Sequence, residues 1–596
     1  MRYPILQARP RTQETLEVFG GYNHNVRIQE NEFYDMRNLT SDMTPVLAPR
    51  KARGLYADKV NVQGMIAKES LCYVDGRELV INAYRSDMGL STKPEHCPKQ
   101  LISMGAYIII LPDKKYFNTA DFTDYGSIEA ETMTTAPVTF DPCRADGTEY
   151  VAEYIQSEEP ESPANTALWI DTSVTPHSLK QFSSSTNMWV GIETTYIKIQ
   201  CAGIGKEFLQ YDGVSITGLK DQRLMSASGT MIEEPEQLEA LEGAAIVYAQ
   251  GDDFITIVGI LDHSVTIANP ITVSRKMPAM DFVIENENRL WGCRYGLNNA
   301  GQVVNELYAC KLGDFKNWNC FMGISTDSYY VSVGTDGQFT GAVALQGHPL
   351  FFKENYLHDV YGQIPANFQV QTISCRGVQK GCERSLAIVN EILYYKARHA
   401  ICSYDGSLPT EVSAALGEER YANAVGAAHG NKYYVSMEKA DGTGHVLMVL
   451  DTAKGMWHRE DDLTAYLFCS CRDELYCATG DGKILTMLGS GEVWEEMVSW
   501  MAETGIIGAS MPERKYLAKL NIRMVLEFGS TATILAQYDS VGPWENLGTL
   551  TGTDLRSFTI PVRPRRCDHL RLRIEAEGKG MVFSITKTFA YGSDVR

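Results

Sequence analysis

The sequence predicts an all-β protein: a β-propeller of six or seven blades, with an inserted β-sandwich or barrel domain and a C-terminal β-sandwich. A short cassette, in which a turn precedes a strongly β-prone run, recurs along the second half of the chain. Aromatic residues make up 10% of the 596 residues, and 31 of them are Tyr, which favours pleated, half-buried sheets. Long helical patterns are few. A period of roughly 40–50 residues built from short strands is typical of propeller blades.

The cassettes carry paired aromatic or aliphatic residues directly after a turn. After the cassette at Leu290 and a longer first step, they follow at steps of about 40–43 residues, a blade-like interval. These copies lie at Leu350, Leu393, Tyr433 and Leu475. Two earlier runs, 70–74 and 106–111, have the same form. Together they predict two separated groups of blades.

The chain begins with a polar, turn-rich stretch. We predict that residues 1–60 form an extended N-terminal arm, because Gly20, Gly21 and the asparagines after them favour turns and no blade cassette occurs there. The first part of the propeller then covers residues 61–126.

A long interruption separates the two groups of cassettes. The gap between the runs at Tyr107 and Leu290 exceeds one blade period by roughly 140 residues. The interval contains stretches rich in Pro, Glu and Ser, together with runs of alternating hydrophobicity that predict half-buried strands. We therefore predict an inserted β domain at residues 127–270, followed by the second part of the propeller at 271–500.

The last block shows five strand patterns separated by turn clusters. The segment 491–505 breaks the blade period and is expected to be a short connecting helix or strand. Residues 501–596 are predicted to form a compact C-terminal β-sandwich.

Charge and cysteine content narrow the possible functions. There are 54 basic and 74 acidic residues, which gives a net charge of −20. Tight nucleic-acid binding needs clustered Lys and Arg, so this composition argues against it. The excess of acidic residues is expected to increase solubility, or to form a channel wall that repels DNA.

The 14 cysteines lie mostly in strand-like runs, so we expect reduced thiols and folding in a reducing cytoplasm. No signal-like segment follows Met1 and no apolar run is long enough for a bilayer, so we expect neither export by that route nor membrane insertion.

A short motif of Asp, turn and Trp recurs. It spans Asp451 to Trp457 and Asp539 to Trp544, with a looser copy at 314–318. The carboxylate is suited to accept backbone N–H groups across the turn, Gly or Asn to adopt positive φ, and Trp to cap the core. The motif resembles the Asp-box of sialidase-like propellers, which marks a fold and carries no catalysis.

Other candidate residues favour structural roles. The pairs Glu233-Glu234 and Asp252-Asp253 lie in turn-like contexts and are interpreted as solvated loop charges. His177, His263 and His399 are scattered and are interpreted as satisfied surface or core residues.

Two further groups have the same interpretation. Cys469 and Cys471 share one face of a strand, which suits packing at least as well as metal ligation. Arg571 and Arg573 alternate with leucines, which predicts a charged face over a packed one, with inter-subunit ion pairing as a further possibility. We therefore expect no catalytic, cofactor-binding or metal-binding residue, and no cofactor.

Several strings resemble the tail-nozzle family of short-tailed phages, also called packaged-DNA stabilisation or tail tubular B proteins. They are FGGYNHNVRIQENEFYDMRNLTSDMTPVLAPRKARG, ENENRLWGC with LGDFKNWNCF, GHPLFFKENYLHDVYGQIPANFQV, NEILYYKARHAICSYDGSLPTEVS, and IPVRPRRCDHLRLRIEAEG with YGSDVR. They cover the arm, the propeller and the last domain, and the inserted stretch matches least.

The resemblance implies a non-enzymatic virion protein of the tail, made in the bacterial host cytoplasm. It implies a homo-oligomeric ring, commonly a hexamer, below the portal and adaptor, which retains packaged DNA and provides the channel for its ejection. Implied partners are adaptor or portal-proximal proteins, spike, fibre or plug proteins, and passing double-stranded DNA without sequence-specific binding. The alternative is a glycan-binding or glycan-cleaving tail-associated propeller, and the third possibility is a bacterial adhesion or scaffold propeller.

Overall fold

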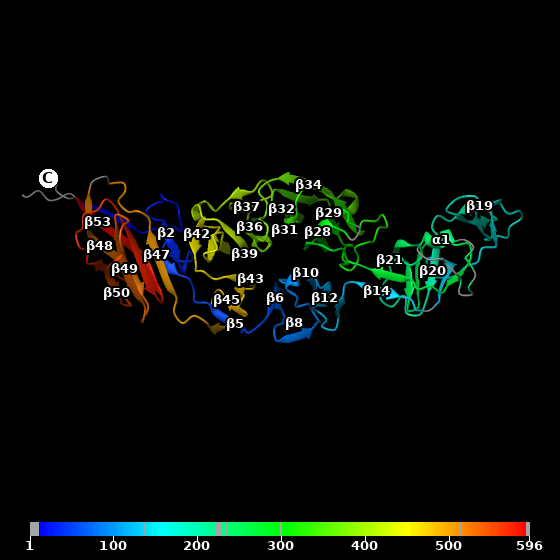
Figure 1. Cartoon of the computed structure of the whole chain (residues 1–596), viewed down its shortest axis with the longest axis horizontal. Helices are drawn as coiled ribbons and strands as arrows, with labels where there is room; N and C mark the ends of the chain where they lie inside the picture. Colours follow the sequence, from blue (N-terminus) through cyan, green and yellow to red (C-terminus); the bar gives the residue numbers. More distant parts are fainter. Residues whose placement is uncertain are drawn as a thin grey trace, which may run out of the picture. The chain divides into compact units, whose positions relative to one another are not determined.

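The computed structural model describes residues 11–135, 137–220, 226, 229, 231–232, 235–298, 301–511 and 514–591. In these residues the chain is almost entirely β-structure (Figure 1). The helices are α1 (Pro235–Glu239) and four single 3₁₀ turns, η1 (Pro94–His96), η2 (Pro365–Asn367), η3 (Glu383–Ser385) and η4 (Ala414–Leu416). No helix within the described ranges has the length and apolarity needed to cross a membrane.

Seven small antiparallel sheets of the described chain have the strand order of β-propeller blades. The first four are β6 (Val62–Ala67), β7 (Leu71–Asp75), β8 (Glu78–Ile81) and β9 (Tyr84–Asp87); β10 (Gln100–Met104), β11 (Tyr107–Leu111), β12 (Lys115–Asn118) and β13 (Tyr125–Ser127); β27 (Phe282–Asn286), β28 (Arg289–Leu297), β29 (Val303–Ala309) and β30 (Tyr329–Ser332); and β31 (Phe339–Leu345), β32 (His348–Lys353), β33 (Tyr356–Tyr361) and β34 (Gln369–Ser374).

The remaining three blade sheets follow later in the chain. They are β35 (Ala387–Val389), β36 (Ile392–Lys396), β37 (Ile401–Tyr404) and β38 (Thr410–Glu411); β39 (Tyr421–His429), β40 (Lys432–Lys439), β41 (His445–Asp451) and β42 (Met456–Arg459); and β43 (Ala465–Cys471), β44 (Glu474–Thr479) and β45 (Lys483–Thr486) with β5 (Gly54–Asp58) and the short β46 (Glu492–Val493). Every cassette identified in the sequence is the second strand of its sheet, so the predicted fold class is confirmed.

The last blade sheet uses a strand from the beginning of the chain. β5 pairs with β45 in antiparallel fashion, with Gly54 opposite Thr486. The prediction assigned all of residues 1–60 to an extended arm, whereas β5 belongs to a blade. A strand pairs through backbone groups that every residue carries, so the local sequence does not reveal a partner more than 400 residues away.

The chain divides into two compact units, which are described separately. Unit 1 comprises residues up to Leu101, Gly337–Asp359 and Gln371 onward, and unit 2 comprises Ile102–Asp336 and Val360–Val370. This division places two blade sheets, β10–β13 and β27–β30, in the same unit as the inserted domain. Their shared core includes Ile109 and Leu290.

Unit 1 ends in a two-sheet sandwich (Figure 1). One sheet has the order β1 (Arg11–Leu16), β53 (Gly580–Tyr591), β48 (Lys515–Leu526) and β51 (Arg556–Ile560). The other has the order β2 (Phe33–Arg37), β47 (Ser499–Thr504), β52 (Leu570–Glu577), β49 (Thr531–Tyr538) and β50 (Glu545–Leu550). Buried residues of both sheets belong to one core. The arm therefore supplies β1 and β2 to this sandwich, and β3 (Leu39–Thr40), which follows β2, pairs with β4 (Ala48–Pro49) in a separate two-stranded sheet.

The inserted domain of unit 2 is also a sandwich. One sheet has the order β14 (Ala130–Met133), β26 (Thr272–Arg275), β21 (Gly213–Thr217) and β22 (Gly243–Ile246). The other has the order β23 (Ala249–Gly251), β24 (Phe254–Val258), β20 (Tyr196–Gln200), β15 (Val138–Cys143) and β25 (Val265–Ile267). Aliphatic residues from both sheets form one core. A separate small sheet contains β16 (Tyr154–Gln156), β17 (Leu168–Asp171), β18 (Ser178–Ser183) and β19 (Met188–Gly191).

Candidate functional site

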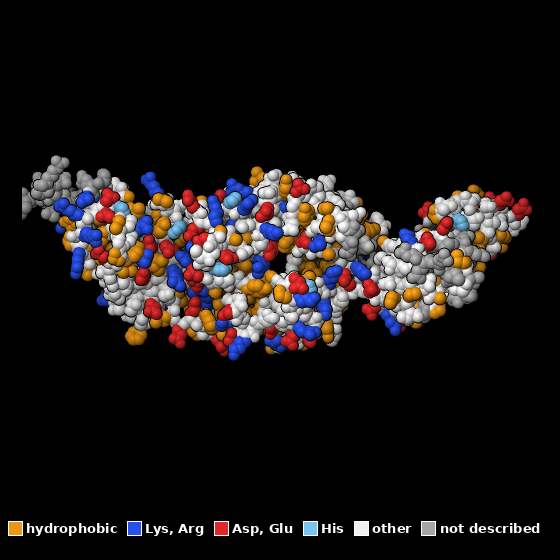
Figure 2. Space-filling view, viewed as in Figure 1, with side chains coloured by type: hydrophobic (Ala, Val, Ile, Leu, Met, Phe, Trp, Pro, Cys, Tyr) orange, Lys and Arg blue, Asp and Glu red, His pale blue; other side chains and the backbone are white. Residues whose placement is uncertain are grey.

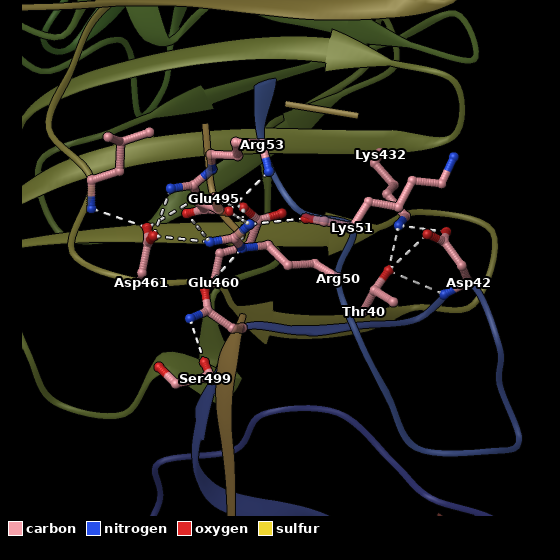
Figure 3. A network of polar contacts seen from close by, with 12 residues as sticks. Thr40, Asp42, Arg50, Lys51, Arg53, Lys432, Glu460, Asp461, Glu495 and Ser499 are labelled. Atoms are coloured by element: carbon pink, nitrogen blue, oxygen red, sulfur yellow. Dashed lines mark hydrogen bonds and ion pairs between the residues drawn. The ribbon is translucent and has the colours of Figure 1, made fainter. Parts of the chain in front are cut away.

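A group of charged side chains converges in unit 1 around two arginines of the N-terminal segment (Figure 3). Arg53 contacts Asp461 through Nη1 at 2.6 Å and Glu460 through Nη2 at 2.8 Å. Arg50 donates hydrogen bonds to both carboxylate oxygens of Glu495, at 2.7 and 3.0 Å. The two arginine side chains are only 5% and 3% exposed. We call these five residues the buried ion network.

The network joins three parts of unit 1. Arg50 and Arg53 lie between β4 and β5, Glu460 and Asp461 follow β42, and Glu495 lies between β46 and β47. It therefore ties the N-terminal segment to a blade and to the segment that enters the C-terminal sandwich. Buried charges that are paired and hydrogen-bonded in this way hold the segments in one geometry, because removing one partner leaves the other charge buried without compensation.

The electrostatics of the network favour the ionised forms of Asp461 and Glu495. Burial acts to raise the pKa of Asp461, but the positive charge of Arg53 and its hydrogen bonds outweigh this and lower that pKa below its ordinary value. Burial also acts to raise the pKa of Glu495. The hydrogen bond and the positive charge of Arg50 outweigh this effect and lower that pKa below its ordinary value. A general acid of a glycosidase needs the opposite, a raised pKa and access to substrate. These carboxylates are suited to structural work.

A second set of contacts pins the N-terminal segment to the sheet β39–β42. Lys432 donates to Asp42 at 2.6 Å and to Thr40 at 3.0 Å (Figure 3). The Ser41 hydroxyl donates to Asp451 at 2.6 Å. Asp451 therefore binds the N-terminal segment through Ser41, in addition to the contact within its own turn.

Asp451 begins the first Asp-turn-Trp motif, and the predicted role is confirmed there. Its carboxylate accepts the backbone N–H of Lys454 at 3.1 Å, and Gly455 has φ +65°. Trp457 is 3% exposed and donates its indole N–H to the Val412 carbonyl at 2.8 Å.

The loose copy at Asp314 differs in one respect. The Asp314 carboxylate accepts the backbone N–H of Lys316 at 3.0 Å, and Trp318 is buried. Asn317, however, does not adopt the predicted positive φ. Its fully buried side chain donates instead to Asp212 of the inserted domain at 2.8 Å, so the position links two sheets of unit 2.

For the copy at Asp539 only the predicted glycine conformation is confirmed, since Gly542 has φ +80°. The predicted contacts of the Asp and the Trp are wrong. Asp539 itself has φ +56°, and its carboxylate accepts N–H groups from Asp568 and His569, which lie on a different segment. Trp544 is only half-buried, with the guanidinium of Arg573 lying 4.2 Å from the centre of its ring. A similar motif thus has a different outcome outside a blade.

The remaining predicted residues stay apart from one another. Asp252 and Asp253 are exposed in a turn, as interpreted, whereas Glu233 and Glu234 lie outside the described residues. His263 and His399 are also exposed. Among the described residues, these aspartates and histidines belong to no group of three or more potential metal ligands.

The arginines of β52 behave as predicted. Leu570 and Leu572 are buried, while Arg571 and Arg573 on the other face pair with Glu503 at 3.4 and 2.6 Å. Figure 2 shows basic and acidic side chains interspersed over the C-terminal sandwich on the face it presents. An interspersed surface lacks the clustered positive charge that phosphate binding requires.

The cysteines act as buried hydrophobes. None of the 14 cysteines forms a disulfide, and 12 of them, Cys469 and Cys471 included, are buried. Burial raises the pKa of Cys469 and of Cys477 to about 12. No group of three or more metal-ligating side chains occurs among the described residues.

The inserted domain contains a hollow that sequence reasoning missed. A groove of about 770 Å³ is lined by the segments around His177 and Glu193, by helix α1 with Glu236, and by the end of β24. His177 Nδ1 lies 2.9 Å from Asp262, which holds one edge of the ring. No sequence signal points to this site, because His177 and Asp262 lie 85 residues apart without any shared motif.

Comparisons with known proteins leave the family open. No family model and no curated protein matches the chain. Similar solved structures include an exo-β-1,3-galactanase from Phanerochaete chrysosporium, with 7% identity and a TM-score of 0.21 over 51% of this chain and 94% of that one. A GH43 glycoside hydrolase engineered at its active site has 9% identity and a TM-score of 0.19 over 52% and 96%. AztD from Citrobacter koseri has 10% identity and a TM-score of 0.25 over 72% and 88%. Similarities this weak carry no argument about function.

Proposed function

We propose that this chain is a non-enzymatic virion protein, the nozzle or hub subunit of a short phage tail. In this role copies assemble into a closed ring, a hexamer by the resemblance, below the portal and adaptor. The ring retains packaged DNA and later conducts it, without sequence-specific contacts. The proposal rests on the family resemblance of the sequence strings together with one structural observation, the buried ion network.

That observation favours a mechanical role over a chemical one. The strongest convergence of arginines and carboxylates in the described part of unit 1 is internally paired, and its two arginines are almost fully buried. It fastens the N-terminal segment, a blade and the entry to the sandwich together, which suits a stiff subunit. Propeller and sandwich bodies offer broad side faces for heterologous ring contacts. The net charge of −20 suits a channel that DNA passes without sticking.

The second candidate is a glycan-binding or glycan-cleaving propeller. The observation that favours it is the groove of the inserted domain, whose lining includes two carboxylates, Glu193 and Glu236. Glycosidases use a pair of acids flanking the scissile bond. The buried ion network offers no such open pair.

Two measurements distinguish these functions: whether the protein assembles into rings, and whether it releases sugar from a polysaccharide. Purified full-length protein is examined by negative-stain imaging and sedimentation, and is incubated with host surface polysaccharide while reducing sugar is measured. Closed rings without sugar release are expected. A monomer that releases sugar overturns the proposal in favour of the glycosidase, and a monomer without turnover favours an adhesion or scaffold propeller.

A further inference from the structure

The groove of the inserted domain continues into a second hollow. The second one, of about 350 Å³, shares Ala240, Leu241 and Val258 with the first and extends to Phe321. The two together form one channel-like depression in unit 2, which we call the insert groove. Its length, rather than a single deep pocket, indicates an extended occupant.

The walls of the insert groove are aliphatic and partly open to solvent. Ile192 is 37% exposed, and Val258 and Phe321 are each 45% exposed. Exposed apolar side chains that line one continuous depression are typical of a binding surface, whereas scattered ones are ordinary.

The backbone edge of β22 faces the insert groove. β22 is the outer strand of its sheet, and the consecutive residues Ala244, Ala245 and Ile246 all line the hollow. Consecutive residues in a strand point to opposite faces, so all three can line it only if the strand presents its edge. An unpaired edge with small side chains allows another strand to approach and add to the sheet.

The charge of the insert groove is of one sign. Glu193 and Glu236 lie in its lining, and no Lys or Arg is among the described residues that line either hollow. His177 is held by Asp262, which is itself almost fully buried. A basic occupant is therefore complementary to the rim.

From these observations we propose that the insert groove binds an extended segment of a partner protein, in which aliphatic residues alternate with Lys or Arg. About four to six residues of this segment add to the edge of β22. Its aliphatic side chains cover Leu241 and Val258, and its cations lie near Glu193 and Glu236. This inference goes beyond the proposed function and does not depend on ring formation.

The test is a fluorescence-anisotropy titration of the full-length protein with a labelled octapeptide of alternating valine and lysine. A peptide of the same composition with the valines and lysines in separate blocks controls for non-specific attraction to an acidic protein. An alternating peptide that is N-methylated at every second residue controls for backbone pairing. Tight binding is expected only for the unmodified alternating peptide.

Two protein variants locate the binding. The double substitution Glu193→Gln with Glu236→Gln is expected to weaken binding about tenfold, since it removes two ion pairs. The matched double substitution Glu161→Gln with Glu207→Gln removes the same charge from exposed positions elsewhere on the inserted domain and is expected to leave affinity unchanged. Equal circular dichroism and melting curves show that both variants are folded.

Other results overturn the assignment. Equal loss of affinity in both variants means a diffuse charge effect, and equal binding of the blocked or N-methylated peptide excludes strand addition. Binding of host oligosaccharides that the Glu193/Glu236 variant alone loses, without peptide binding, assigns the insert groove to glycan instead.

Discussion

The blade sheets and the C-terminal sandwich of unit 1 are both antiparallel, yet they bury their strands differently. β40 and β41 each contain an unbroken run of at least five buried residues, so both faces of the strand are covered. In β49 and β52 buried residues alternate with exposed or half-exposed ones. A blade is covered by a neighbouring sheet on each side, whereas each sandwich sheet is covered on one. The burial pattern thus records how many sheets cover a strand.

The two Asp-turn-Trp motifs of unit 1 extend this comparison. Trp457 of the blade is buried and hydrogen-bonded, whereas Trp544 beside the sandwich is half-buried under an arginine. Two similar Asp-turn-Trp motifs are therefore expected to contribute differently to the free energy of unfolding.

The largest expected effect tests this difference directly. Trp457→Ala should lower the free energy of unfolding by about 3–5 kcal/mol, because it removes a buried aromatic side chain. Trp544→Ala should cost less than about 1.5 kcal/mol, since it removes a half-exposed cation–π contact. Urea unfolding followed by circular dichroism measures both. Equal costs would contradict the comparison.

The buried ion network offers a second test. Arg53→Ala leaves Glu460 and Asp461 buried without their main partner, and should destabilise the protein by about 3–4 kcal/mol. The control is Arg85→Ala in β9, because the Arg85 side chain is 46% exposed and pairs with surface carboxylates. That change should cost about 0–1 kcal/mol. If the two variants melt at the same temperature, the network does not fasten the segments.

Two buried histidines of the blades should make stability depend on pH. Burial, together with the charge of Lys353, lowers the pKa of His358 to about 4, and burial with the charge of Lys432 lowers that of His458 to about 4. The ordinary value in the unfolded chain is about 6.5. Between these values the unfolded chain binds more protons, so stability is complete above pH 6.5 and falls as the pH drops toward 4.

The expected slope is up to about 1.4 kcal/mol per pH unit for each histidine. Urea midpoints at neutral pH and at about pH 5 measure it. The double substitution His358→Gln with His458→Gln should flatten the dependence, while His399→Gln, at an exposed position, should keep it. A midpoint that does not change with pH in the unsubstituted protein would refute the assignment.

The smallest effects compare single hydroxyl groups. Tyr433→Phe removes a buried hydrogen bond to the Ser385 carbonyl and should cost about 1 kcal/mol. Thr533→Ala on the outward face of β49 removes an exposed contact with Thr549 and should cost about 0.5 kcal/mol or less. Thermal unfolding resolves the difference. A larger loss for the threonine would reverse the order that burial predicts.

Much of the strand content was predictable from the sequence. The cassettes at Leu71, Leu350 and Leu475 lie in second strands of blades, because continuous β-prone runs are what doubly covered strands require. The alternation of leucines with Arg571 and Arg573 predicted one packed face for β52 for the same kind of reason. By contrast, the contacts of Trp544 were not predictable, since its motif resembles that of Trp457.

By itself, the sequence determined that the cassettes become strands and that β52 has one packed and one charged face, because side-chain hydrophobicity and its period act locally. Only the tertiary structure decided that β5 completes the last blade sheet, that β1 and β2 join the C-terminal sandwich, and that Arg53 meets Asp461. Strands pair through backbone groups common to all residues, and an arginine accepts any nearby carboxylate. Partners of both kinds are therefore selected by proximity in the folded chain.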